Sequence, residues 1–110
     1  MKSIIYPGTF DPIHNGHIDI VKKVSKLFDQ VIIVVAVNKE KNPLFSEQER
    51  KELIRESISD ISNVNVTSFN GLVVEYAKEK NALAIVRGLR HVSDFEFEFQ
   101  MAMMNYNLNP

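Results

Sequence analysis

Two histidines three residues apart, His14 and His17, stand in a stretch whose composition suits the handling of phosphate. Residues 6–17 read YPGTFDPIHNGH, after a short apolar run and before an amphipathic one. Gly8 and Gly16 allow tight turns and let a ligand approach the backbone closely. A helix that begins beside the second histidine would offer free N–H groups and a partial positive charge, both of which attract phosphate. The stretch therefore predicts a phosphate-binding loop with imidazole donors beside it.

The elements that would position this loop alternate between strand and helix. The hydrophobic pattern predicts strands at 3–6, 31–37, 63–69 and 82–86, and helices at 18–28, from 47 to about 61, and 72–80. Ser46 and Glu49 have the spacing of a capping box, which starts the second helix. The unbroken apolar run 31–37 is typical of a central parallel strand, whereas the alternating run 63–69 favours an edge. The residues expected to face the core from the helices are Ile20, Val21, Val24, Leu27, Phe28, Leu53, Ile54, Ile58, Ile61, Val73, Tyr76 and Ala77.

The last stretch, residues 95–106, fits two patterns. Phe95, Phe97, Phe99, Met101 and Met103 alternate with the period of a strand. As a helix, the same stretch would carry two apolar faces. The alternation of strands and helices before it favours a helix, whose second apolar face would meet another subunit.

The predicted order is β-α-β-α-β-α-β-α, which favours an α/β, Rossmann-like three-layer fold with a parallel sheet. Ligands of such sheets bind beyond the carboxyl ends of the strands, where the strand order reverses. Thr9, Lys41 and Arg87 each follow the end of a predicted strand and would converge there. The G-x-G-x-x-G fingerprint and the Walker A motif are both absent, which counts against a dehydrogenase and a P-loop ATPase.

Composition narrows the class of protein further. The chain has 110 residues, enough for one domain, and no cysteine for disulfides or a thiolate metal site. Thirteen basic and fourteen acidic residues leave it nearly neutral, which argues against binding nucleic acid non-specifically. The longest apolar run is too short to span a membrane, and the N-terminus lacks an export segment. We expect a cytoplasmic protein with no membrane partner.

Four blocks carry a resemblance to a known family. The HNGH of residues 14–17 resembles the H-x-G-H signature of the nucleotidyltransferases. The preceding PGTFDP, KNPLF at 41–45, RGLR at 87–90 and DFEFE at 94–98 are similar to one branch, the phosphopantetheine adenylyltransferases of coenzyme A biosynthesis. The resemblance runs along the whole chain. Family members continue with a further strand and a serine-rich segment, so we interpret residues 1–110 as a single nucleotidyltransferase domain that is incomplete at its C-terminus.

The resemblance implies that AMP passes from ATP to 4′-phosphopantetheine, giving dephospho-coenzyme A and pyrophosphate. The attacking phosphate oxygen is already an anion, so the reaction needs positioning and charge neutralisation rather than a protein nucleophile. Mg²⁺ is expected as cofactor, carried by the phosphates with no metal ligand from the protein. Family members assemble into homo-oligomers, hexamers among them.

The resemblance also assigns roles to residues. His17 would stabilise the transition state, and His14 would lie near the ATP phosphates. The residues implied for catalysis are His17, Lys41 and Arg90. Those implied for the acceptor are Thr9, Lys41, Val73 and Arg87. Those implied for ATP are Thr9, Phe10, His17, Gly88, Leu89, Arg90 and Glu98, with Phe10 contributing its backbone. Asp11 has no proton to remove from a phosphate anion, so we interpret it as a carboxylate that fixes the loop.

Several of these residues also have a purely structural interpretation. His17 could simply cap its own helix, Thr9 could be a turn residue, and Lys41 and Glu98 could be solvated surface charges. Two functional alternatives also remain. One is another H-x-G-H nucleotidyltransferase that uses CTP or nicotinamide mononucleotide, against which the RGLR and DFEFE blocks argue. The other is a non-catalytic fragment that binds nucleotide weakly or associates with itself through an unpaired sheet edge.

Overall fold

The computed structural model describes residues 2–37, 43–88 and 97–101, with side chains described within 2–37 and 43–86. The elements follow one another as β1 (Ser3–Gly8), α1 (Asn15–Ser25), β2 (Gln30–Ala36), α2 (Glu47–Ser57), β3 (Val64–Phe69), α3 (Val73–Glu79), β4 (Ala84–Gly88) and β5 (Phe97–Met101). Through β4, this order is the strand–helix alternation that the hydrophobic pattern predicts.

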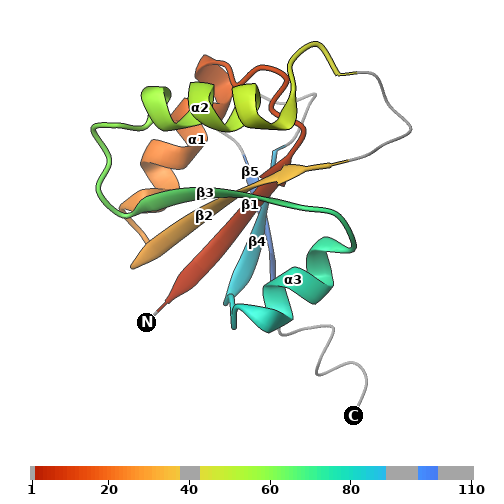
Figure 1. Ribbon diagram of the computed structural model, residues 1–110. Coiled ribbons are helices and arrows are strands. Elements are labelled where there is room, and N and C mark those ends of the chain that lie inside the picture. Colours follow the sequence, from red (N-terminus) through yellow and green to blue (C-terminus); the bar gives the residue numbers. More distant parts are fainter. Residues whose placement is uncertain (1, 38–42, 89–96, 102–110) are drawn as a thin grey trace.

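The five strands form one sheet in the order β3-β2-β1-β4-β5 (Figure 1). The four strands from β1 to β4 are parallel, and Ile5 of β1 lies opposite Ile32 of β2 on one side and Ile85 of β4 on the other. The chain moves outward from β1 to β3 and then returns to the far side of β1 with β4. The strand order therefore reverses at β1, and the edge position predicted for β3 is confirmed.

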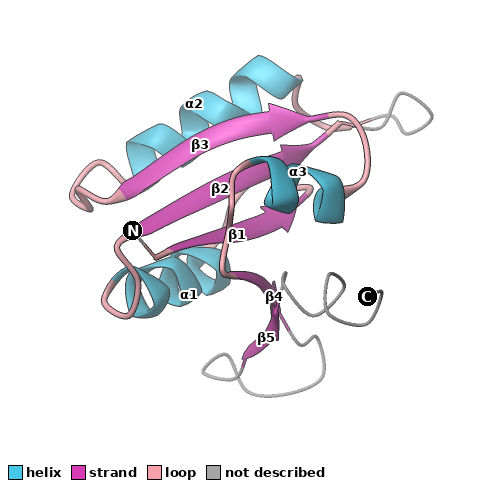
Figure 2. Cartoon of the chain, turned by 90° about the horizontal axis from the view of Figure 1, so that it is seen from below, coloured by secondary structure: helices cyan, strands magenta, loops and turns pink. Residues whose placement is uncertain are grey.

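Helices cover both faces of the sheet, which gives three layers. Figures 1 and 2 show α1 and α2 on one face and α3 on the other. Successive side chains of a strand point to opposite faces. Ile4 and Tyr6 accordingly join the core beneath α1 and α2, whereas Ile5 joins the core beneath α3. Because both faces are covered, the central strands must be apolar at nearly every position.

Helix α1 begins at Asn15, three residues before the predicted start, and ends at Ser25, three residues before the predicted end. Ile20, Val21 and Val24 are buried against the sheet. The helix stops at Ser25, so Leu27 falls beyond its last turn and is 63% exposed. The prediction that Leu27 faces the core is wrong, because the helical stripe does not extend to it.

Helix α2 has the predicted capping box. The Ser46 hydroxyl accepts from the Glu49 N–H over 3.1 Å, and the Glu49 carboxylate accepts from the Ser46 N–H over 3.0 Å. Ile54 and Ile58 are buried in the core, and Ile61 packs against it. Within the described ranges, no helix is long and apolar enough to cross a membrane.

The C-terminal helix predicted over 95–106 is contradicted where the structure describes that stretch. Residues Phe97–Met101 form β5, antiparallel to β4, with Glu98 opposite Arg87 and Phe97 opposite Gly88. The period-2 pattern prevails here because the outer edge of β4 offers unpaired backbone groups that a neighbouring strand satisfies. The argument that a second apolar helix face meets another subunit therefore does not apply to these residues.

Candidate active site

Three of the predicted site residues, Thr9, Arg87 and Gly88, lie where the strand order reverses. Thr9 directly follows β1, and Arg87 and Gly88 are the last two residues of β4. Since Ile5 and Ile85 are partners in these adjacent parallel strands, two steps further along bring Pro7 and Arg87 to the same level. Arg87 thus lies within β4 rather than just past it, a difference of two residues in the strand boundary. The carboxyl ends of β1 and β4 border the crevice position where ligands of such sheets bind.

His17 occupies the third position of α1, and its side chain takes part in capping the helix. Nδ1 of His17 accepts a hydrogen bond from the His14 N–H over 3.1 Å, and Nδ1 of His14 accepts from the Gly16 N–H over 3.1 Å. A neutral imidazole has one donor nitrogen and one acceptor nitrogen. Because Nδ1 is the acceptor, the proton of neutral His17 resides on Nε2. Capping and donation to a ligand are therefore compatible roles for this residue.

Three rings lie around the imidazole of His17, with that of Tyr6 the farthest at 6.3 Å between centroids. The His14 ring stacks on it with centroids 3.7 Å apart, and the Phe10 ring meets it at 4.8 Å in an edge arrangement. Burial, and secondarily the charge of a protonated His14, lower the pKa of His17 to about 4. His17 is therefore neutral at pH 7 and presents an uncharged Nε2–H donor.

Phe10 is the structural centre of the loop. Its side chain is 2% exposed and packs edge-on against Tyr6, with centroids 5.3 Å apart, and its φ of 49° turns the backbone sharply. A Cβ at Gly8 would lie 3.0 Å from this ring, so only glycine fits there without a shift. Burial raises the pKa of Tyr6 to about 12, which keeps its phenol neutral. Only the backbone of Phe10 remains available to a ligand, while the neighbouring Thr9 is exposed.

Asp11 joins this loop to the segment before α2. Its two carboxylate oxygens accept hydrogen bonds from the Leu44 N–H over 2.6 Å and from the Phe45 N–H over 2.8 Å. Both oxygens thus serve to hold backbone. The interpretation of Asp11 as a loop-fixing carboxylate is confirmed by these contacts.

Two further predicted site residues, Val73 and Glu98, lie on α3 and β5. Val73 is the first residue of α3 and packs, half-buried, against the core on the α3 side of the sheet. Glu98 lies on β5, beside the Arg87 backbone, instead of on the predicted helix. Lys41, Leu89 and Arg90 lie outside the described residues.

Arg50 is a site residue that the sequence reasoning missed. It lies in α2 with its side chain 4% exposed, and one guanidinium nitrogen donates to the Thr9 carbonyl over 3.0 Å. Two features of the sequence point to such a role. A basic residue near the start of a helix opposes the helix dipole. Arg50 also stands four residues before Ile54, on the inward face of α2.

A hollow of about 570 Å³ lies elsewhere, lined by the end of α2, the α2–β3 connection and residues 64–66 of β3. Residues 64–66 are the first half of β3, so the hollow is at the opposite end of the parallel strands from Thr9. Because it lies at that other end of the sheet, the hollow is separate from the candidate site.

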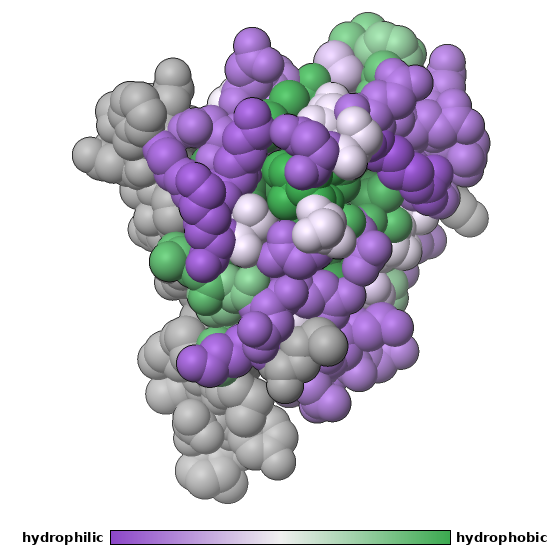
Figure 3. Space-filling model, turned by 90° about the vertical axis from the view of Figure 1, so that its left-hand side faces the viewer, coloured by the Kyte–Doolittle hydropathy of each residue, from purple (hydrophilic) through white to green (hydrophobic). Residues whose placement is uncertain are grey.

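Figure 3 shows one face of the molecule by hydropathy. On this face, hydrophilic side chains surround a smaller hydrophobic area.

The geometry of the loop suits stabilisation of a phosphate that gains negative charge. The N-terminal end of α1, an eleven-residue helix, contributes a partial positive charge. His17 adds a neutral donor fixed by its cap and by ring packing, which needs no reorganisation when charge develops. A histidine with so low a pKa is a poor proton carrier at pH 7, so the site favours electrostatic stabilisation over acid–base chemistry.

Comparison with protein families agrees with this chemistry. The family described as cytidylyltransferase-like matches residues 5–110. A relative from Caldanaerobacter subterraneus subsp. tengcongensis, named phosphopantetheine adenylyltransferase, is 59% identical over all 110 residues, which correspond to 69% of its length. A protein of the same name from Clostridium tetani is 53% identical over the same span and is covered to the same extent, 69%.

Solved structures show the same fold. The lipopolysaccharide core biosynthesis protein from Thermoplasma volcanium superposes with a TM-score of 0.63 at 26% identity, over 86% of this chain and 80% of that one. A NadR protein in complex with NAD and AMP-PNP superposes with a TM-score of 0.56 at 30% identity, over 63% of this chain and 20% of that one.

Proposed function

The chain belongs to the phosphopantetheine adenylyltransferase family of nucleotidyltransferases, and on that premise we propose that it transfers AMP from ATP to 4′-phosphopantetheine. The products are dephospho-coenzyme A and pyrophosphate. The observation that carries the proposal is the fixed, neutral Nε2–H of His17 at the N-terminal end of α1, beside the carboxyl ends of β1 and β4.

In this reaction a phosphate oxygen of 4′-phosphopantetheine attacks the α-phosphorus of ATP in line, and the bond to the bridging oxygen of pyrophosphate breaks. The attacking oxygen is an anion, so no base is required. His17 donates through Nε2 to an α-phosphate oxygen as negative charge builds there. Thr9 offers its hydroxyl and N–H to the phosphate that joins the two substrates.

The cations of the reaction are assigned by resemblance. Arg87, at the end of β4, binds the acceptor phosphate through its guanidinium fork. Lys41 and Arg90 neutralise the phosphates during transfer, and Gly88, Leu89 and Glu98 contact ATP. Val73 contacts the pantetheine arm.

Magnesium supplies further charge neutralisation on the ATP phosphates when it is bound. Both carboxylate oxygens of Asp11 already accept backbone N–H groups. In the part of the chain that the structure describes, no three His, Asp or Glu side chains gather into a metal-binding group. We expect the ion to be held mainly by phosphate oxygens and water.

The test is release of pyrophosphate from ATP and magnesium, with and without 4′-phosphopantetheine, by this 110-residue chain. Release should require the acceptor, and His17→Ala should lower kcat by about 10²–10³-fold, as removal of one transition-state donor does. Asp19→Ala is the matched control, two residues further along α1 in a half-buried ion pair with Lys23.

Each other outcome has a distinct meaning. Release that depends on nicotinamide mononucleotide rather than 4′-phosphopantetheine would replace the acceptor and keep the reaction class. No release with either acceptor would overturn the proposal for residues 1–110, which span 69% of the length of the Caldanaerobacter relative. Equal activity of His17→Ala and the wild-type chain would remove the role assigned to His17.

A further inference from the structure

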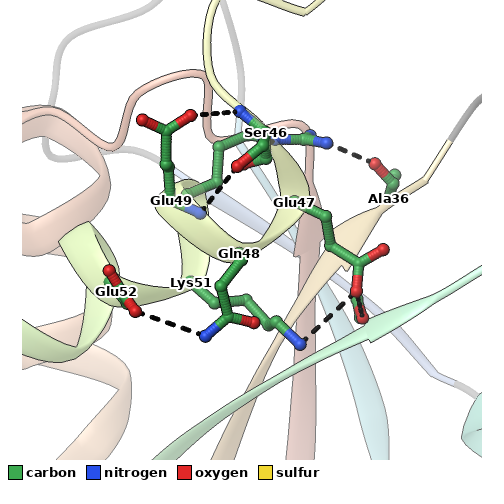
Figure 4. Close-up of polar contacts among 9 residues, drawn as sticks. Ala36, Ser46, Glu47, Gln48, Glu49, Lys51 and Glu52 are labelled. Carbon is green, nitrogen blue, oxygen red and sulfur yellow. Dashed lines mark hydrogen bonds and ion pairs between the residues drawn. The ribbon is translucent and has the colours of Figure 1, made fainter.

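Arg50 is buried beneath the phosphate-binding loop, and among the described residues its hydrogen bonds all go to backbone carbonyls. Its Nη1 donates to the Thr9 carbonyl over 3.0 Å and to the Ala36 carbonyl over 3.3 Å, and its Nε donates to the Ser46 carbonyl over 3.4 Å. Figure 4 shows the first turns of α2, with Ser46 at the helix start, and a dashed line that ends on the Ala36 carbonyl at the end of β2; this line marks the hydrogen bond that Ala36 accepts from Arg50. One side chain therefore ties together three segments of the chain.

The three segments all border the candidate site. Thr9 follows β1, Ala36 ends β2, and Ser46 caps α2. Asp11 makes the complementary connection, because its carboxylate accepts from the amides of residues 44 and 45. The loop after β1 is thus held by a buried cation through one carbonyl and by a carboxylate two residues later.

The charge of Arg50 also bears on the loop. A guanidinium stays protonated even when it is buried. Within the described residues, no carboxylate lies at ion-pairing distance from Arg50, since the ion pairs there join Lys23 to Asp19 and Lys51 to Glu47. The positive charge beneath Thr9 therefore meets carbonyl dipoles and, without a direct ion pair, the charge of Glu47, whose pKa the Ser68 hydroxyl and, to a smaller extent, Arg50 lower. It favours an anion at the loop.

We propose that Arg50 is a positioning residue for the acceptor phosphate: by holding the Thr9 carbonyl it fixes the peptide plane that carries the Phe10 N–H and limits rotation of the Thr9 backbone, and so orients the donors of Thr9 and Phe10 toward that phosphate. This inference rests on the proposed adenylyl transfer. It predicts that Arg50 acts through Thr9, so the effects of changing the two residues must not be independent.

The experiment is a double-mutant cycle with Arg50→Lys, Thr9→Ala and the combined variant. Lysine keeps the charge, but its single ammonium cannot reproduce the guanidinium fork that serves three carbonyls. Each single variant should raise the KM for 4′-phosphopantetheine about tenfold, the equivalent of one hydrogen bond from a charged group. The KM for ATP should change less, and the combined variant should be no worse than the poorer single one.

Arg55→Lys provides the matched control, because Arg55 lies one turn further along α2 and is exposed. It should retain wild-type constants. Arg50→Lys with lowered Tm but unchanged KM and kcat, assayed below its Tm, would reduce Arg50 to a structural residue and overturn the proposal. Single effects that multiply in the combined variant would do the same, because they would show that Arg50 does not act through Thr9.

A binding measurement on the wild-type chain distinguishes failure of this proposal from failure of the proposed function. It needs no variant, so the folding of a variant does not affect it. In the wild-type chain, inorganic phosphate is titrated while the NMR signals of the Thr9 amide and the Arg50 Nε–H are followed. Both signals should shift together, with one dissociation constant. If Thr9 responds and Arg50 does not, the positioning role is rejected even if turnover is observed. If both respond in a chain without turnover, the function fails and the coupling between Arg50 and the anion site stands.

Discussion

The backbone N–H of His14 donates to Nδ1 of His17 over 3.1 Å, and the two imidazole rings stack with centroids 3.7 Å apart. One residue thus starts the helix, assigns the tautomer of the other and covers one face of its ring. The His-x-Gly-His spacing is what allows this, because the third helical position returns its side chain to the N-cap backbone.

The first prediction concerns the protonation of His17 in the free protein. Burial and the neighbouring His14 should keep its imidazole neutral down to a pKa of about 4, with the proton on Nε2. Nitrogen chemical shifts of a ¹⁵N-histidine sample, followed from pH 7.5 to pH 3.5, report both the midpoint and the tautomer. A midpoint near the ordinary 6.5, or a proton on Nδ1 at neutral pH, would contradict the geometry described above.

The second prediction follows from the sign of that shift. The pKa of His17 is lower in the folded state than in the unfolded state, so the unfolded chain binds the extra proton between about pH 6.5 and pH 4. The stability that this difference contributes is complete above pH 6.5 and is lost as pH falls through this window. One proton corresponds to a slope of at most about 1.4 kcal/mol per pH unit, and the partial solvent exposure of His17 reduces it.

Urea unfolding at several pH values, with wild type compared against His17→Gln, checks this prediction. The slope of the free energy of unfolding between pH 6.5 and pH 4.5 should be shallower in the variant. Below pH 4.5 both chains should lose further stability, because the Ser68 hydroxyl lowers the pKa of Glu47, and the Ser46 backbone N–H that of Glu49. Parallel curves above pH 4.5 would show that the folded state does not resist protonation of His17.

Much of the fold could be predicted because it depends on short patterns of neighbouring residues. The run 31–37 is apolar at every position, and Ser46 and Glu49 have the spacing of a cap, so β2 and the start of α2 fall where the pattern places them. Residues 97–101 could not be decided in this way. Their apolar residues fit either period, and the choice depends on whether the edge of β4 needs a partner, which is a property of the assembled sheet.

In the candidate site, too, some features follow from short sequence motifs and others depend on the folded arrangement. A motif identifies His17 and the place of Thr9, since both follow from short spacings in the sequence. The low pKa of His17 comes first from burial, and one of the rings packed against it belongs to Phe10, whose backbone has a positive φ. The contact between Arg50 and Thr9 joins residues 41 apart in the chain. Neither can be deduced from residue types before the loop and α2 are brought together.

The third prediction concerns the connection made by Asp11. Asp11→Asn leaves one acceptor oxygen for two backbone N–H groups and removes the charge that strengthens both hydrogen bonds. We expect a loss of about 1.5–3 kcal/mol in the free energy of unfolding, measured in urea. Asp19→Asn is the matched control, because its ion pair with Lys23 is a solvent-accessible pair four residues apart on one helix, worth about 0.3–0.5 kcal/mol. Equal losses in the two variants would mean that Asp11 does not hold the segment before α2.

The last prediction concerns Gly16, which lies under the His14 ring. A Cβ at this position would stand 2.9 Å from Cε1 and 3.0 Å from Nδ1 of His14, so Gly16→Ala must displace that ring. The ring is exposed and can move, and alanine is the better helix former by about 1 kcal/mol, which offsets the loss of the bond to the Gly16 N–H. Stability should therefore change by less than about 1 kcal/mol.

The pKa of His17 should nevertheless rise in Gly16→Ala, because the charge of a protonated His14 moves away from its ring. It should stay below 6.5, since burial is the larger cause of the lowered pKa and the Phe10 contact remains. Histidine titration by NMR measures the change, with Asn15→Ala as the control at the adjacent, exposed helix position. An unchanged His17 midpoint in Gly16→Ala would show that the His14 ring does not act on His17, and that burial alone keeps the imidazole neutral.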